Sequence, residues 1–132
     1  MRIDENSKSV IVHFTDKMIS DFSLMTEDEN MLHTSNLFAR ESGYEGGRIV
    51  NGAFIISISN SLVANYVGHG CLILSQEAKF LSPCHSGYRC RFCIESIHDH
   101  LGGNYSEYKV VVNSTDSKEI IFSKIKYLVK IP

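Results

Sequence analysis

The stretch IVNGAFIISISNSLVANYV, residues 49–67, decides the fold. It contains no Asp, Glu, Lys or Arg, and from Asn51 onward its residues are apolar or small on every side of a helix. A helix that is apolar all round is stable only where other elements cover it. Because Ser and Asn residues interrupt the run, and a membrane span needs roughly 20 predominantly apolar residues, we expect a buried helix and no membrane segment.

The rest of the chain predicts strands that cover this helix. A β-branched run, Val10–Phe14, forms a strand or an extended entry segment. Alternating apolar and polar residues then predict four further strands, over roughly residues 71–82, 88–98, 104–114 and 119–131. Turn signals separate these four segments at Pro83–Gly87, Gly102-Gly103 and Asp116-Ser117. A curved antiparallel sheet wrapped around one long central helix is the α+β hot-dog fold, which the pattern therefore predicts.

Two short helices are expected before the central one. Thr15 can cap a helix that ends near Thr26, where the sequence turns polar. Thr34 or Ser35 can cap a second helix over residues 36–41, which a Ser-Gly pair ends.

Size and charge limit the classes of protein to consider. A chain of 132 residues, 43% hydrophobic and 21% charged, predicts a single domain over residues 1–132, with residues 1–9 as a flexible leader. A net charge of -2 and a pI near 6.3 provide no basic surface for nucleic acid. The acidic N-terminus lacks the pattern of a signal peptide, so we expect a cytoplasmic protein.

Four cysteines raise the question of a metal site. They are Cys71, Cys84, Cys90 and Cys93, and without a secretion signal we expect reduced thiols. Cys90 and Cys93 form a C-x-x-C, but strand residues three apart point to opposite faces. Cys90 should turn inward with Tyr88, Phe92 and Ile94, while Cys93 turns outward. The pattern therefore favours no bound metal.

The candidate chemistry lies just before the central helix. Asp28 and His33 are a carboxylate and an imidazole five residues apart, and Gly52 opens the helix itself. Taken alone, Asp28 equally fits a solvated turn acid, and His33 equally fits a surface residue that caps a helix. Together they suit an acid/base pair, because a histidine titrates near neutral pH and burial can raise a carboxylic acid toward it.

These segments resemble the MaoC-like (R)-specific enoyl-CoA hydratases, a hot-dog family with the pattern D-x-N-P-x-H followed by a V-H-G helix start and a serine. The matching residues are Asp28, Asn30, His33, Val50, Gly52 and Ser57. Two positions depart from the pattern, since Met31 replaces the proline and Asn51 replaces the usual histidine. Residues 79–83, KFLSP, also match the family's R/K-F-x-x-P strand end.

The resemblance implies a role for each matching residue. It makes Asp28 and His33 the catalytic pair. It also implies that the Gly52 N–H binds the thioester oxygen and that Ser57 forms a supporting hydrogen bond near the carboxylate. Unpaired N–H groups and the helix dipole at the start of a helix suit an oxyanion. Asn30 either fixes the loop or binds the water, and Asn51 keeps a hydrogen-bonding group but cannot carry a proton at neutral pH.

The resemblance implies a hydratase/dehydratase that interconverts trans-2-enoyl and (3R)-3-hydroxyacyl thioesters of coenzyme A or acyl-carrier protein. It implies no metal or redox cofactor. A hot-dog acyl thioesterase and a catalytically silent module that binds acyl thioesters are the alternatives. We also expect a homodimer, because a lone sheet leaves an unpaired edge and one side of the apolar helix uncovered.

Overall fold

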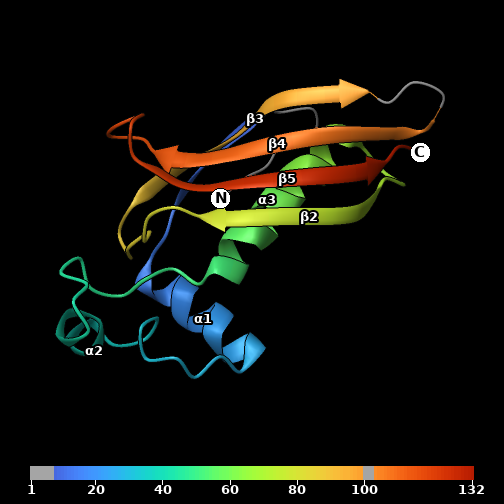
Figure 1. The fold of residues 1–132 in the computed structure, drawn as a ribbon. Helices are drawn as coiled ribbons and strands as arrows, with labels where there is room; N and C mark the ends of the chain where they lie inside the picture. The colour runs from blue at the N-terminus through green and yellow to red at the C-terminus, as the bar shows by residue number, and fades with distance from the viewer. Residues whose placement is uncertain (1–7, 100–102) are drawn as a thin grey trace.

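The computed structural model describes residues 8–99 and 103–132, which form one antiparallel sheet and three helices (Figure 1). In chain order the elements are β1 (Ser9–His13), α1 (Asp16–Thr26), α2 (Asn36–Glu41), α3 (Gly52–Val67), β2 (Leu72–Phe80), β3 (Arg89–Asp99), β4 (Tyr105–Ser114) and β5 (Ile121–Lys130). The strand order across the sheet is β1-β3-β4-β5-β2, and all neighbours are antiparallel. α3 crosses one face of the sheet, and α1 lies by its first turn (Figure 1). This is the predicted hot-dog fold.

α3 is buried on one side only. The side chains that it presents to the core are Ile55, Ile58, Ser59, Leu62 and Val63. Ala53, Ser57 and Ser61, spaced four apart on the opposite side, are exposed. A single curved sheet covers one side of a helix, so the other side of this apolar helix lacks cover within the described residues. Among the same residues, no helix has the length and apolar character needed to cross a membrane.

Local capping places the first two helices where the sequence predicts them. Thr15 Oγ1 accepts the Met18 N–H at 3.2 Å at the start of α1. Ser35, rather than Thr34, caps α2, and its Oγ accepts the Phe38 N–H at 3.0 Å. Both caps satisfy an N–H group that has no partner within its helix.

The N-terminal prediction needs a correction. Ser9 already belongs to β1, and the Lys8 carbonyl accepts the Ile94 N–H at 2.8 Å, so these two residues are tied to the sheet rather than part of a flexible leader. The remainder of the predicted leader, residues 1–7, lies outside the described residues.

Aromatic packing joins α1 to the first turn of α3. The Phe54 ring of α3 stacks on Phe22 of α1, with 4.7 Å between ring centroids. It also meets Phe14, at the end of β1, edge-on at 5.3 Å. These contacts hold the C-terminal end of α1 beside the N-terminus of α3, where the candidate site lies.

Candidate active site

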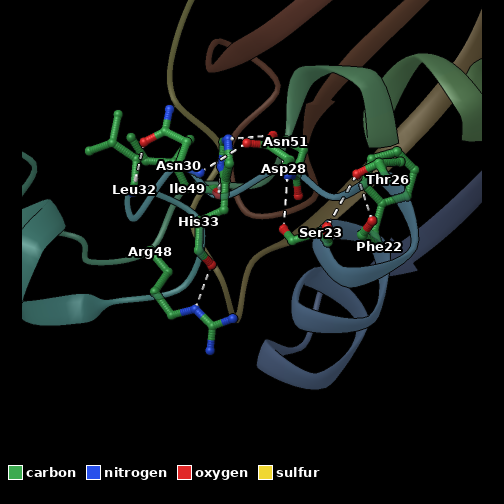
Figure 2. Close-up of polar contacts among 10 residues, drawn as sticks. All are labelled: Phe22, Ser23, Thr26, Asp28, Asn30, Leu32, His33, Arg48, Ile49 and Asn51. Carbon is green, nitrogen blue, oxygen red and sulfur yellow. Dashed lines mark hydrogen bonds and ion pairs between the residues drawn. The ribbon is translucent and has the colours of Figure 1, made fainter.

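A tight turn after α1 positions the carboxylate of Asp28 (Figure 2). Glu27 takes a left-handed conformation, with φ of 57°, and ends α1 at Thr26. The Asp28 N–H then donates to the Ser23 carbonyl at 2.9 Å. Oδ1 of Asp28 accepts the Asn30 N–H at 3.0 Å, as in an Asx turn. Oδ2 is therefore the oxygen that faces the rest of the site.

Further hydrogen bonds fix the loop between the carboxylate and the imidazole. Asn30 Oδ1 accepts the Leu32 N–H at 3.1 Å, so in this structure Asn30 braces the loop. The Met31 carbonyl accepts the N–H groups of Thr34 and Ser35 at 3.2 and 3.0 Å. These backbone bonds close the turn at the position where the resembled family has a proline ring.

His33 is held with one ring nitrogen toward Asp28. Its Nδ1 lies 2.7 Å from the Ile49 carbonyl oxygen. Because a carbonyl oxygen can only accept, Nδ1 carries the hydrogen of this bond, and Nε2 is the nitrogen that can gain or lose a proton. Nε2 lies 3.5 Å from Asp28 Oδ2, and the His33 side chain is 13% exposed against 38% for Asp28.

Arg48 is a supporting residue to which the sequence analysis gave no role. It is buried, its Nε donates to the His33 carbonyl at 2.7 Å, and its Nη2 donates to Ser20 Oγ at 2.6 Å. Its Nη1 also lies 3.4 Å from Asp16 Oδ1. Arg48 thus ties α1 to the loop that carries His33. In the sequence, the only sign of this role is the position of Arg48 directly after two glycines.

Asn51 contacts the carboxylate directly. Its Nδ2 lies 3.3 Å from Asp28 Oδ2 and 3.1 Å from Ser23 Oγ (Figure 2). The pKa of Asp28 is lowered, first by the hydrogen bond from the Asn30 backbone and then, against the opposing effect of burial, by the Asn51 amide and the nearby His33. The ionised form of Asp28 is therefore favoured.

Gly52 begins α3 under an aromatic ring. A Cβ atom at this position would lie 2.8 Å from Cζ of Phe80, so only glycine fits without displacing the ring. The first N–H groups of the helix have no partner in their own helix, which suits them to bind an anionic oxygen. Phe80, in the KFLSP match, is a site residue whose contact with Gly52 the sequence did not indicate.

A cavity of about 300 Å³ joins the imidazole to the start of the helix. It is lined by His33, Ile49, Val50, Gly52, Ile55, Phe80, Leu81, Ser82, Pro83 and Cys84. Asp28 lines a separate hollow of about 690 Å³ with Ser20, Ser23, Leu24, Glu27, Glu29 and Thr34. Asp28 and His33 therefore line different hollows, although their side chains approach each other. A further hollow of about 610 Å³ over β2, β4 and β5 contains neither member of the pair.

The structure does not place Ser57 as predicted. Its Oγ donates to the Ala53 carbonyl at 2.8 Å within α3, and the side chain is exposed. The residue whose side chain bonds to Asp28 is Asn51, because the N-terminus of α3 meets the loop while position 57 faces away from the core. Asp28, Asn30, His33 and Asn51 are thus brought together, with Gly52 beside them and Ser57 apart.

The cysteines occupy two different environments. Cys90 is fully buried and Cys93 is partly exposed, as predicted. The prediction for Tyr88 is wrong: it is 41% exposed and does not turn inward with Cys90, because it lies in the turn before β3. Cys90 Sγ lies 3.2 Å from Cys84 Sγ. Across residues 8–99 and 103–132, no three His, Cys, Asp or Glu side chains are grouped so that they could hold a metal ion.

Comparison with solved structures supports the fold assignment. The (R)-hydratase from A. caviae involved in PHA biosynthesis superposes with a TM-score of 0.82 at 18% identity, covering 100% of this chain and 98% of that chain. R-hydratase PhaJ1 from Pseudomonas aeruginosa gives 0.83 at 16% identity, covering 100% and 83%. The HadBC (3R-hydroxyacyl-ACP dehydratase) complex from Mycobacterium tuberculosis gives 0.71 at 11% identity, covering 98% and 99%. At these identities the likeness shows a shared fold.

Sequence comparison assigns the family. A search of curated proteins found no match. The family model for the MaoC like domain, however, matches residues 2–118 of the 132. That match covers most of the chain and includes the loop with Asp28 and His33, α3 and the strands β1 to β4, but not β5. Hydratases and dehydratases are among the solved structures that resemble this chain. The protein therefore belongs to the MaoC-like domain family.

Proposed function

We propose that this protein interconverts trans-2-enoyl and (3R)-3-hydroxyacyl thioesters, with Asp28 and His33 as the acid/base pair. The observation that carries the proposal is the approach of His33 Nε2 to Asp28 Oδ2, 3.5 Å, beside the first turn of α3. The Ile49 carbonyl fixes the other ring nitrogen, so the imidazole is held ready to exchange a proton at Nε2.

The pair suits the proton balance of hydration. One group takes a proton from water as the water oxygen bonds to the β-carbon, and the other gives a proton to the α-carbon as the double bond is lost. Each turnover therefore leaves one group with an extra proton and the other without one. A proton passed between Asp28 and His33 resets the pair, and the reverse sequence removes water.

The start of α3 suits the remaining requirement, which is to stabilise the enolate oxygen that forms on the thioester. We propose that the N–H of Gly52 donates to this oxygen. His33 and Gly52 line the same cavity, so a substrate held there would contact both. Phe80 lies directly over Gly52 and would pack against the thioester or move aside for it.

The proposed substrates are thioesters of coenzyme A or of acyl-carrier protein. The names of similar structures, an (R)-hydratase and a 3R-hydroxyacyl-ACP dehydratase, support this class. Water addition involves no net oxidation, so the proposed reaction requires no redox cofactor, and the acid/base pair provides its proton transfers without a metal. A cytoplasmic location, expected from the sequence, is part of the same proposal.

A direct assay tests the proposal. The protein is mixed with crotonyl-CoA and, separately, with 3-hydroxybutyryl-CoA, while the enoyl absorbance and free-thiol release are followed together. Loss of the enoyl signal without thiol release supports the hydratase. Thiol release instead supports the acyl thioesterase, and saturable binding without either change supports the silent binding module. The latter two results would both overturn the proposed reaction.

Two variants make the assay specific for the site. Asp28→Asn should abolish most of the loss of enoyl absorbance. Asp21→Asn, the same chemical change at an exposed position of α1 that pairs with Lys17, should not. Equal activity in both variants would show that another group is responsible for the turnover.

A further inference from the structure

Asn51 occupies an unusual position for an amide side chain. It is 2% exposed and precedes the first residue of α3, yet it makes no side-chain cap with the helix. Its Nδ2 instead reaches outward, to Ser23 Oγ at 3.1 Å and to Asp28 Oδ2 at 3.3 Å. The amide therefore serves α1 and the loop rather than its own helix.

The orientation of this amide depends on the charge of Asp28. Both Nδ2 hydrogens are directed to acceptors, while Oδ1 is buried and has no hydrogen-bond partner among the described residues. An unpartnered buried carbonyl oxygen is unfavourable. The reverse orientation, however, would direct Oδ1 at a carboxylate oxygen, and two acceptors repel unless Asp28 is protonated. The observed orientation thus fits an ionised Asp28.

We propose that Asn51 is a positioning residue that keeps Asp28 ionised and oriented toward His33, so that Asp28 takes the proton from water and His33 donates to the α-carbon. This inference rests on the proposed function and adds to it the direction of each proton transfer. A carboxylate can act as the base only while it is ionised, and a donor held at Oδ2 favours that form. The protonated His33 is then the acid of the pair.

An amide and a histidine would act differently at this position. A neutral imidazole carries one N–H and itself titrates near neutral pH, whereas the amide has two N–H hydrogens and does not titrate. Among the described residues, the charged groups beside Asp28 are His33 in the same loop and Glu27 and Glu29 in the same hollow. The Arg48 guanidinium bonds to the His33 carbonyl. Asn51, directly before α3, thus adds a hydrogen-bond donor to Asp28 that does not change its charge with pH.

Substitutions at Asn51 test the proposal through the titration of Asp28. Carboxyl ¹³C NMR of the free protein follows this titration without any substrate, and Asp28→Asn identifies the signal. Asn51→Ala should raise the pKa of Asp28, and Asn51→Asp should raise it further, because a second carboxylate then faces the first. Asn51→His restores one donor, so the pKa of Asp28 in this variant should lie closer to that of the parent than the pKa of Asp28 in Asn51→Ala does.

The same variants should move the acid side of the pH profile of kcat/KM. Loss of activity on acidification reports protonation of the base in the free enzyme. Its midpoint should shift upward in Asn51→Ala and more strongly in Asn51→Asp. Asn65→Asp, the same change in α3 about 21 Å along the helix axis, should leave both the profile and the Asp28 titration where they are.

The two measurements separate this inference from the proposed function. Because Asn51 makes no cap bond, Asn51→Ala should fold, and its melting transition checks this. A folded Asn51→Ala protein with an unchanged Asp28 titration overturns the positioning role even if hydration is observed. The other case is an upward shift of the Asp28 titration in Asn51→Ala when the parent protein shows no hydratase activity. The positioning of Asp28 by Asn51 would then stand, but the proposed reaction and the proton directions assigned to it would be overturned.

Discussion

At the scale of single residues, Asp28 and His33 each use one atom to hold the loop and offer another to the partner. Oδ1 of Asp28 and Nδ1 of His33 are engaged with backbone groups, while Oδ2 and Nε2 face each other at 3.5 Å. If the pair acts as a unit, either Asp28→Asn or His33→Ala should reduce kcat by about 100- to 10,000-fold. The double variant should be little worse than either single one, as measured by steady-state kinetics.

Additive losses in the double variant would mean that Asp28 and His33 act separately. A folded double variant that hydrates an enoyl thioester at close to the parent rate would rule out the assignment altogether. His69→Ala provides the control for the histidine change, because His69 is exposed and lies after the end of α3.

Burial also predicts how the thiols react. Cys93 should be alkylated in the native protein well before Cys90, and partly exposed Cys71 should accompany it. Cys84 should resist too, because its hydrogen bond with Cys90 and its burial raise the pKa of the Cys84 thiol and suppress the reactive thiolate. Peptide mapping after brief alkylation measures the order, with the urea-unfolded protein as the control. Equal rates at Cys90 and Cys93, or stoichiometric zinc in the purified protein, would contradict this view.

At the scale of elements, a buried hydroxyl links β5 to α3. Tyr127 Oη lies 2.7 Å from both Ser59 Oγ and Asn60 Oδ1. Tyr127→Phe would leave these groups without their partner in the core, so the free energy of unfolding should fall by about 1–2 kcal/mol. Urea unfolding near pH 8 measures the loss. Tyr105→Phe, at an exposed position, is the matched control and should change little.

The same tyrosine should make the fold sensitive to alkali. Burial raises the pKa of Tyr127 from 10.0 to about 12, only partly offset by the hydrogen bond with Ser59. Its contribution to stability is therefore fully present below pH 10 and is lost as the pH rises toward about 12, because the unfolded chain ionises first. Unfolding free energies measured between these pH values should fall more in the parent than in Tyr127→Phe. Equal slopes would show that other groups control the alkaline transition.

At the scale of the whole molecule, we expect a homodimer that covers the edge of the sheet at β2. β2 is an edge strand, and Leu72, Leu74 and Phe80 on it are 58%, 45% and 52% exposed. Exposed apolar strand edges favour pairing with a second chain. Light scattering at micromolar concentration should give twice the mass of the 14.9 kDa chain. A stable monomer would contradict the expectation.

A pair of charge substitutions identifies the edge involved. Leu74→Glu on β2 should shift the population toward monomer, because a buried carboxylate without a partner is unfavourable. Ile11→Glu, at a 46% exposed position on the opposite edge strand β1, should leave the dimer intact. Dissociation by the β1 variant alone would assign the interface to the other edge.

The sequence by itself determined the features that depend on neighbouring residues. Capping by Thr15 and Ser35, the apolar run of α3 and the alternation in the strands involve residues a few positions apart, and each occurs as predicted. The resemblance of one short loop to the family pattern is what paired Asp28 with His33, and because both lie in that loop their side chains approach to 3.5 Å. Their role in catalysis stays a prediction.

Only the tertiary structure decided which distant groups complete the site. Asn51 reaches Asp28 across 23 positions, Arg48 reaches the His33 carbonyl across 15, and Phe80 covers Gly52 from the end of β2. The motif alone instead paired Ser57 with the carboxylate, but Ser57 bonds within its own helix. Such contacts depend on how α1, the loop and the sheet end pack around the first turn of α3, and neither side-chain periodicity nor capping encodes that packing.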